Sequence, residues 1–273
     1  MSYKSVTVQI ADLIAEVTLV GPGKGNAMGP DFWSEMPRVF AELDANPDVR
    51  AVVLTGSGNN FSYGLDLTAM GGGALAPAFT GEMTARDRLA LQDEIRSMQT
   101  AVTAVAECRK PVVAAISGWC IGGGVDLITA ADIRYASIDA KFSVREVKVA
   151  IVADMGTLAR LPQVVGDGHA RELALTGKDI DAARAEKIGL VNDVFDGQEA
   201  VLAAARATAR EIADQSPLAM AGVKEVLNFS RRSAQDESLK FVAVWNAAFL
   251  ASKDLLAAIT GVMTKQQPKY TGE

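Results

Sequence analysis

Residues 120–126 read CIGGGVD, with three consecutive glycines between an apolar run and the carboxylate of Asp126. A strand that ends in glycines and opens a helix leaves backbone N–H groups of the helix N-terminus without partners, and the missing side chains let a ligand atom approach them closely. The helix dipole adds partial positive charge at the same place. The spacing therefore predicts a site for an oxygen that carries or acquires negative charge.

A second loop of the same kind lies earlier in the chain. Residues 59–66, NNFSYGLD, follow a buried strand, contain Gly64 and lead toward a helix-like start. The N–H groups of Leu65 and Gly123 could converge on one carbonyl oxygen, and losing one such donor typically costs roughly 3 to 4 kcal/mol of transition-state stabilisation. Close packing of a strand against a helix explains the same glycines equally well.

The chain has one histidine, His169, and two cysteines, Cys108 and Cys120. His169 lies in VVGDGHARELAL, where a helix is expected to begin, and no catalytic partner stands near it, so we expect a surface or capping role. These three residues cannot complete a zinc site, and a disulfide is not expected in a cytosolic protein. Carboxylates are therefore the expected acids and bases, and we expect no metal.

The elements that must position these groups alternate between strands and helices. Residues 6–10 and 13–20 are expected to form a hairpin of two strands around Ala11 and Asp12. Helices are then expected over 30–43, 84–108 and 123–130, and strands over 50–55, 111–117 and 133–136. Uninterrupted apolar strands are typical of sheets covered by helices on both faces. The fold class is therefore α/β.

From about residue 170 the pattern is mostly helical, and such a tail packs on its own domain or on a neighbouring subunit. Helices are expected over 182–188, 198–214, 217–228, 235–251 and 254–263. Residues 71–81, GGGALAPAFTG, predict a mobile loop that helps Tyr63 and Met70 to shape a pocket. Residues 21–29, GPGKGNAMG, lack the third glycine of a dinucleotide loop and the Ser or Thr of a phosphate loop, which favours a tight turn.

Charge and hydropathy exclude several classes of partner. A net charge of -6 argues against a broad nucleic-acid surface. The N-terminal residues lack the apolar segment of a secretion signal, and the longest uncharged apolar run, residues 111–125, is too short and too rich in glycine to span a bilayer. We expect a cytoplasmic protein that binds neither nucleic acid nor membrane.

Several motifs, in this order along nearly the whole chain, together resemble the crotonase, or enoyl-CoA hydratase/isomerase, superfamily. They are GNAM, FSYGLDL, KPVVAAISGWCIGGGVDL, ADIRYAS, GTLARLP and SPLAMAGVKEVLN. The resemblance implies a crotonase-type spiral of ββα units over residues 1–195 and a C-terminal helical trimerisation region over 196–273, assembled as a homotrimer or homohexamer.

The resemblance also implies an acyl-CoA thioester as the substrate. Coenzyme A then enters as part of the substrate, and no separate cofactor is expected. The N–H groups of Leu65 and Gly123 would hold the thioester oxygen while it becomes an enolate. The implied substrate-binding residues are Lys24, near the CoA phosphates, and Ala27, Tyr63, Gly64, Asp66 and Gly122.

Three carboxylates bear on the choice of reaction. The resemblance implies two catalytic glutamates in the hydratases of this family. Here the first position is Asp126, which is shorter by one methylene, and the second is Glu146 in SVREVKVAI. Asp154 in IVADMGT stands where hydratases usually carry glycine. The full set is similar to the dienoyl-CoA isomerases, which carry a proton from C2 to C6 of a 3,5-diene to form a 2,4-diene. Glu146 is then the base at C2, Asp154 the acid at C6, and Asp126 lies between them, although the two ends could be exchanged.

Physical chemistry permits this division of roles. Neighbouring carboxylates in an apolar pocket resist ionising together, so one can remain protonated while another is a base. Taken alone, Asp126 could serve the helix dipole, Asp154 could cap a helix and Glu146 could be a solvated strand residue. The expected function is isomerisation of 3,5-dienoyl-CoA to 2,4-dienoyl-CoA in fatty-acid β-oxidation. The alternatives are an enoyl-CoA hydratase and a non-catalytic acyl-CoA-binding protein.

Overall fold

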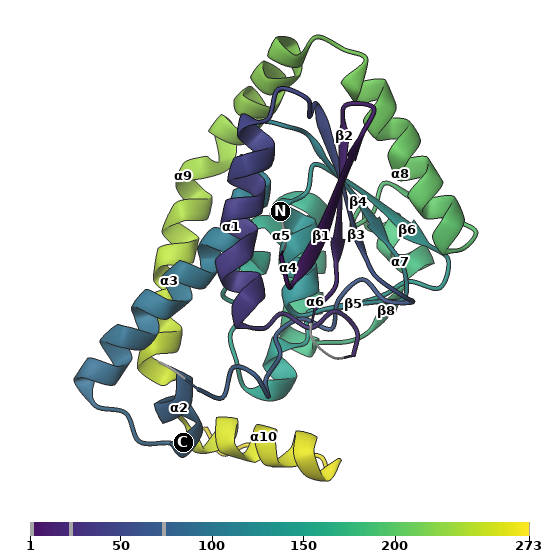
Figure 1. Ribbon diagram of the computed structural model, residues 1–273. Coiled ribbons are helices and arrows are strands. Elements are labelled where there is room, and N and C mark those ends of the chain that lie inside the picture. Colours follow the sequence, from purple (N-terminus) through teal and green to yellow (C-terminus); the bar gives the residue numbers. More distant parts are fainter. Residues whose placement is uncertain (1–2, 22–23, 73–74, 273) are drawn as a thin grey trace.

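A six-stranded sheet forms the centre of the protein, in a computed structural model that describes residues 3–21, 24–72 and 75–272 (Figure 1). Its strands lie in the order β1-β2-β3-β4-β6-β9. β1 and β2 are antiparallel, and the later pairings in this sheet are parallel. The strands are β1 (Val6–Ala11), β2 (Ile14–Leu19), β3 (Ala51–Gly56), β4 (Val112–Ile116), β6 (Ile133–Ser137) and β9 (Asp193–Phe195).

The hairpin between β1 and β2 is the one predicted around Ala11 and Asp12. Its register pairs Ala11 with Ile14, so the turn consists of Asp12 and Leu13. Both turn residues have positive φ, 50° and 66°, as two-residue turns that match the twist of a hairpin usually do.

Helices cover both faces of the sheet, as the apolar strands predicted. Every residue of β3 and β4 is buried. Val53 on β3 belongs to the apolar cluster under α8, and its neighbour Leu54 belongs to the larger core on the other face, under α1, α3 and α4. The α/β class is therefore confirmed. α3 buries one apolar stripe, which consists of Leu91, Ile95, Met98, Val102 and Val105.

The helices are α1 (Pro30–Ala45), α2 (Ala76–Thr80), α3 (Ala85–Glu107), α4 (Gly123–Ala130), α5 (Thr157–Val165), α6 (Asp167–Thr176), α7 (Ala182–Lys187), α8 (Gln198–Ala213), α9 (Pro217–Phe249) and α10 (Lys253–Thr264). A 3-10 turn, Glu146–Val149, precedes α5. The prediction of a loop over 71–81 was wrong for residues 76–80, which form α2, and residues 73 and 74 lie outside the described residues.

A smaller sheet positions the glycine-rich loop. It consists of β5 (Trp119–Ile121), β7 (Lys141–Ser143) and β8 (Ile180–Asp181), in that order. Gly122 joins β5 to α4 with φ of 53°, and its N–H donates to the Ser143 carbonyl at 3.0 Å. A β-carbon disfavours this left-handed conformation, so glycine here lets the chain turn from the strand directly into the helix.

The C-terminal helices depart from prediction in one respect. Residues 217–249 form one helix of 33 residues, α9, where two helices over 217–228 and 235–251 were predicted. The intervening polar residues contain no glycine or proline, so the helix continues through them and leaves most of them exposed. α9 packs along α3, and α10 follows at an angle of 87° (Figure 1).

Within the described ranges, no single helix is long and apolar enough to cross a membrane. α9 and α10 meet the requirements of length and composition only as a bent pair.

Candidate active site

A cavity of about 240 Å³ lies beside the start of α4 and brings most of the predicted site residues together. The predicted residues in its wall are Tyr63, Leu65, Gly122, Gly123, Asp126, Glu146 and Asp154. Apolar side chains that the sequence analysis did not single out complete much of the wall, among them Trp33, Met98 and Met155. An apolar wall with a few carboxyl groups suits a ligand that is mostly hydrocarbon at this point.

The two predicted loops meet at one end of this cavity. A β-carbon on Gly64 would lie 2.9 Å from the amide nitrogen of Gly123, and one on Gly123 would lie 3.8 Å from the amide nitrogen of Leu65. Gly123 is the first residue of α4, so its N–H has no acceptor within the helix. The Leu65 N–H has no backbone acceptor in the described part of the chain. Both donors therefore border the same space, as an oxyanion site requires.

Asn26 holds the loops in register, and the sequence analysis missed it although it lies within GNAM. Its side-chain amide donates to the carbonyls of Ser57 and Asn60, at 2.9 and 2.8 Å. The Ser62 hydroxyl donates to the Asn26 carbonyl at 2.9 Å and accepts the N–H of Gly64 at 3.0 Å. Asn tolerates positive φ better than most residues, and Asn26 has φ of 52°. An Asn within a glycine-rich loop was therefore the signal that could have marked this position.

Asp126 occupies the first turn of α4 and is 1% exposed. Its Oδ1 accepts the backbone N–H of Thr157, the first residue of α5, at 2.5 Å. Burial raises the pKa of Asp126, while the Thr157 hydrogen bond and the charge of Arg160 pull that pKa back down. The carboxyl group therefore lies between the N-terminal turns of two helices, and its anion has support from α5 and from one buried cation.

Glu146 begins the 3-10 turn and lies next to the glycine-rich loop. A β-carbon on Gly122 would lie 3.5 Å from its Oε1, and its Oε2 is buried without a hydrogen-bond partner among the described residues. Burial, and next the charge of Asp126, raise the pKa of Glu146 well above its usual value. Glu146 thus lies beside Gly122 of the predicted oxyanion loop, although it comes from a different segment of the chain.

Asp154 lies in an irregular segment between the 3-10 turn and α5. Its Oδ2 accepts a hydrogen bond from Asn246 on α9 at 2.6 Å. Burial raises the pKa of Asp154 to about 7, with the Asn246 bond lowering it and the charge of Asp126 raising it. Asp154 does not cap α5, because the residue at that N-cap is Gly156.

Arg160 on α5 is the cation whose charge acts on Asp126. It lies within the motif GTLARLP, which did not indicate this role. It is 4% exposed, and its Nε and Nη1 have no partners in the described part of the protein. Burial lowers its pKa, and the charge of Asp126 raises it. A β-carbon on Gly156 would lie 1.8 Å from Nη1, so only glycine leaves room for this guanidinium group.

Four of the predicted binding residues lie outside the cavity wall. Lys24 is exposed and Ala27 is half-buried in the first loop. Gly64 lies within the first oxyanion loop, against Gly123, and its carbonyl accepts the Met28 N–H at 2.8 Å. The Asp66 carboxylate accepts the backbone N–H groups of Thr68 and Ala69 at 3.1 and 2.9 Å. These bonds order the turn that follows the loop over 59–66.

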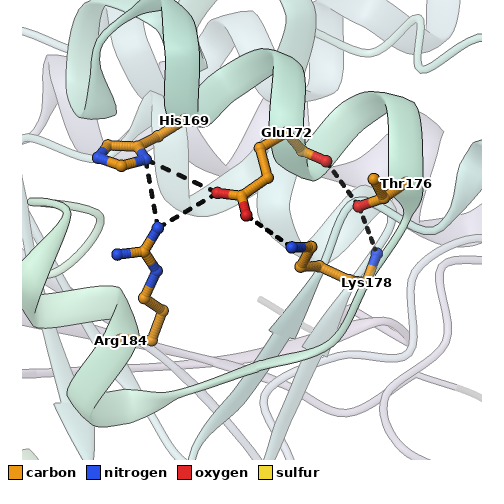
Figure 2. Close-up of polar contacts among 5 residues, drawn as sticks. All are labelled: His169, Glu172, Thr176, Lys178 and Arg184. Atoms are coloured by element: carbon orange, nitrogen blue, oxygen red, sulfur yellow. Dashed lines mark hydrogen bonds and ion pairs between the residues drawn. The ribbon is translucent and has the colours of Figure 1, made fainter.

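His169 belongs to a surface network and does not line the cavity (Figure 2). Its Nδ1 lies 3.3 Å from Nη2 of Arg184, which also reaches Glu172 at 3.2 Å. Lys178 completes the network by donating to Glu172 at 2.6 Å. These contacts join α6 to α7, so the expected surface role of His169 is confirmed.

The two cysteines are buried, and they do not form a disulfide. Burial raises the pKa of Cys108 to about 11 and raises that of Cys120 well above its usual value. Protonated thiols are poor nucleophiles. Among the described residues, no group of three His, Cys, Asp or Glu side chains could hold a metal ion.

Comparisons with known proteins agree with this geometry. The family model described as enoyl-CoA hydratase/isomerase matches residues 9–273. The chain is 45% identical over 249 residues to a peroxisomal Delta(3,5)-Delta(2,4)-dienoyl-CoA isomerase of Arabidopsis thaliana, covering 91% of this chain and 89% of that protein. It is 42% identical over 270 residues to the mitochondrial isomerase of that name from Homo sapiens, covering 98% and 82%. The crystal structure of an enoyl-CoA hydratase/isomerase from Pseudoalteromonas atlantica superposes with a TM-score of 0.85 at 25% identity, covering 98% and 100%.

Proposed function

The chain belongs to the enoyl-CoA hydratase/isomerase family, and we propose that it converts 3,5-dienoyl-CoA to 2,4-dienoyl-CoA in fatty-acid β-oxidation. The observation that carries this proposal is a third carboxyl group, Asp154, in the same cavity as Asp126 and Glu146. A hydratase needs acids and bases around one water, whereas a shift of two double bonds needs a proton acceptor and a proton donor at separated carbons. The isomerase names of the relatives point the same way.

The geometry suggests which end of the substrate each group serves. The thioester oxygen would accept the N–H groups of Leu65 and Gly123, which places C2 beside the glycine-rich loop. Glu146 lies against Gly122 in that loop, so we assign it as the base that removes a proton from C2. Asp154 comes from a different segment and is assigned as the acid that protonates C6. Asp126 contacts neither end in this scheme and sets the charge between them.

The proton inventory of the three carboxyl groups fits a proton transfer. Burial raises the pKa of all three, and the charge of Asp126 raises the pKa values of Glu146 and Asp154 further. The group therefore retains a proton near neutral pH. In the reaction Asp154 gives its proton to C6, Glu146 gains one from C2, and transfer of that proton back to Asp154 restores the starting state.

The electron pair of the broken C2–H bond forms the new 2,3 double bond through a dienolate, whose negative oxygen the two N–H groups stabilise. Substrate and product are isomers, so the reaction balances without a redox or metal cofactor. We therefore propose that coenzyme A, as part of the substrate, is the only cofactor moiety involved.

The test mixes purified protein with a 3,5-dienoyl-CoA and, separately, with a 2-enoyl-CoA, and follows the absorbance of the conjugated thioester. Growth of the 2,4-dienoyl signal, reduced about 10²- to 10⁴-fold in Asp154→Asn, supports the isomerase. Hydroxyacyl product from the 2-enoyl-CoA without diene conversion makes the protein a hydratase that uses Asp126 and Glu146. Binding of both thioesters without any product makes it a non-catalytic acyl-CoA-binding protein.

We further propose that the protein assembles as a homotrimer or a homohexamer through its C-terminal helices. Large apolar side chains of α9 and α10 are exposed on the single chain, namely Val223, Val226, Phe229, Phe241, Trp245, Phe249 and Met263. Exposed apolar patches of this kind mark interaction sites. A division into a core over 1–195 and a helical region over 196–273 remains part of this proposal, with α8 packed on the sheet and α9 packed on α3.

Other assignments also remain proposals. Lys24, Ala27, Tyr63, Gly64, Asp66 and Gly122 are proposed to contact or shape the site for the CoA thioester. The cytoplasm is the expected compartment, although relatives of this chain carry peroxisomal or mitochondrial in their names. Fractionation of the source cells would decide between these compartments.

A further inference from the structure

The catalytic acid assigned above lies on a segment without regular structure. Residues 151–154 form neither helix nor strand, so their own hydrogen bonds do not fix the direction of the Asp154 carboxyl group. Two buried amides from distant helices contact this segment instead. Gln99 on α3 donates to the Asp154 carbonyl at 2.8 Å, and Asn246 on α9 donates to the Asp154 carboxylate.

Asn246 makes two hydrogen bonds with one nitrogen. It is 2% exposed. Its Nδ2 donates to the carbonyl of Val152 at 2.8 Å and to Oδ2 of Asp154 at 2.6 Å. The Val152 carbonyl can only accept, so it fixes which end of the amide faces this segment. Asn246 consequently offers Asp154 a donor and no acceptor.

A donor-only partner decides which oxygen of Asp154 can carry a proton. A protonated Oδ2 would be a weaker acceptor for the Asn246 N–H, and its own hydrogen could not bond to that donor. The contact therefore favours Oδ1 as the oxygen that carries the proton of a neutral Asp154. We propose that Asn246 is a positioning residue that reserves Oδ1 of Asp154 for the proton exchanged with the substrate. This inference rests on the isomerase function proposed above.

The contact also has the right electrostatic sign for an acid that must lose its proton. When Oδ1 gives its proton to C6, the carboxylate left behind keeps the Asn246 N–H, and hydrogen bonds to an ionised acceptor are stronger than neutral ones. The same bond lowers the pKa of Asp154 against the effect of burial. Asn246 faces this carboxyl group from α9, and the acids Asp126 and Glu146 share its cavity. Gln99 from α3 contacts only the backbone carbonyl of Asp154.

The experiment measures the pH dependence of kcat and the KM for 3,5-dienoyl-CoA in wild type, Asn246→Ala and Gln99→Ala. Gln99→Ala is the matched control, because it frees the same segment without removing a hydrogen bond from the carboxylate. In Asn246→Ala we expect kcat to fall about 10- to 100-fold with KM changed less than about threefold. The limb on which activity falls with rising pH should move about one to two pH units higher, the size expected for a lost hydrogen bond to a charged group.

The control separates positioning from general loosening. In Gln99→Ala we expect the position of this limb to stay within about 0.3 pH units of wild type, whatever happens to kcat. The role of Asn246 is overturned if the pH limb shifts equally in both variants, or if Asn246→Ala keeps the pH limb and the kcat of wild type. Either result leaves the isomerase function standing. A wild-type protein that converts no diene overturns both. Asn246→Ser, which keeps a polar side chain too short for both bonds, should show the same shift if the Ala variant does not fold.

Discussion

Replacement of Asp154 by Asn should stabilise the protein while it removes the activity. The pKa of Asp154 rises from 3.8 to about 7 on folding, because the folded state disfavours the anion. The folded state therefore binds more protons than the unfolded state between these values, and the free energy of unfolding falls as pH rises through this window. Below about pH 4 both states are protonated and the penalty is absent.

The magnitude follows from the size of the pKa change. A rise of about three pH units corresponds to about 4 kcal/mol at 1.36 kcal/mol per unit. The Asp154 residue remains partly exposed where it lines the cavity, so we expect water to reduce this to about 2 to 4 kcal/mol above pH 8. Asn has nearly the same shape and its amide oxygen can still accept the Asn246 N–H, so the variant removes the charge with little loss of contact.

Urea unfolding of wild type and Asp154→Asn at pH 5 and pH 8.5 measures this effect, at one protomer concentration because assembly contributes to stability. The advantage of the variant should widen by about 2 kcal/mol between the two pH values. Asp48→Asn is the matched control, since it removes a carboxylate from an exposed position away from the cavity. The burial of this charge would be refuted if the difference in free energy of unfolding between wild type and Asp154→Asn were the same at both pH values, or if the variant were less stable than wild type at pH 8.5.

Three further predictions test other parts of the site and the assembly. Glu146→Gln should lower kcat for diene conversion about 10²- to 10⁴-fold while the Kd for acyl-CoA in calorimetry stays within a few-fold, and a kcat within tenfold of wild type would contradict its role as the base. Gly64→Ala should lower kcat about 10²-fold because its β-carbon would intrude between the two oxyanion loops; Gly58→Ala, at a similar positive φ with open space around it, controls for backbone strain. Phe241→Asp should reduce the mass measured by light scattering to that of smaller assemblies, whereas Leu175→Asp, equally exposed on α6, should not.

Local patterns in the sequence singled out the two glycine loops because such patterns describe short segments. The glycines at 122–124 and the acid at Asp126 are separated by a single turn of helix, so their relation in space follows from the element type alone. The loop over 59–66, which contains Leu65, likewise follows directly after a buried strand, so its position at the end of that strand follows from the local sequence. The pattern singled out Leu65, Gly123 and Asp126, the family resemblance added Glu146 and Asp154, and all five line one cavity.

The residues that hold those carboxyl groups could not be found in the same way. Asn246 lies 92 positions after Asp154, on a helix for which the sequence predicted only packing on its own domain or on a neighbouring subunit. Arg160 reads as an ordinary helical arginine until the fold places it beside Asp126, and the need for Gly156 is visible only once the guanidinium group is there. Both assignments depend on which helices pack together, and spacing along the chain does not carry that information.

Asp126 connects these supporting residues to the reaction. Thr157 and Arg160 favour its ionised form, and its charge raises the pKa values of both Glu146 and Asp154. A cation that contacts neither proton-transfer group thereby influences both of them through one carboxylate. Loss of Arg160 would favour protonation of Asp126, and a neutral Asp126 would let both of its neighbours ionise at lower pH. The charges of Arg160 and Asp126 thereby favour a proton shared by Glu146 and Asp154, which the proposed reaction needs, and this is a physical reason for a buried arginine beside the cavity.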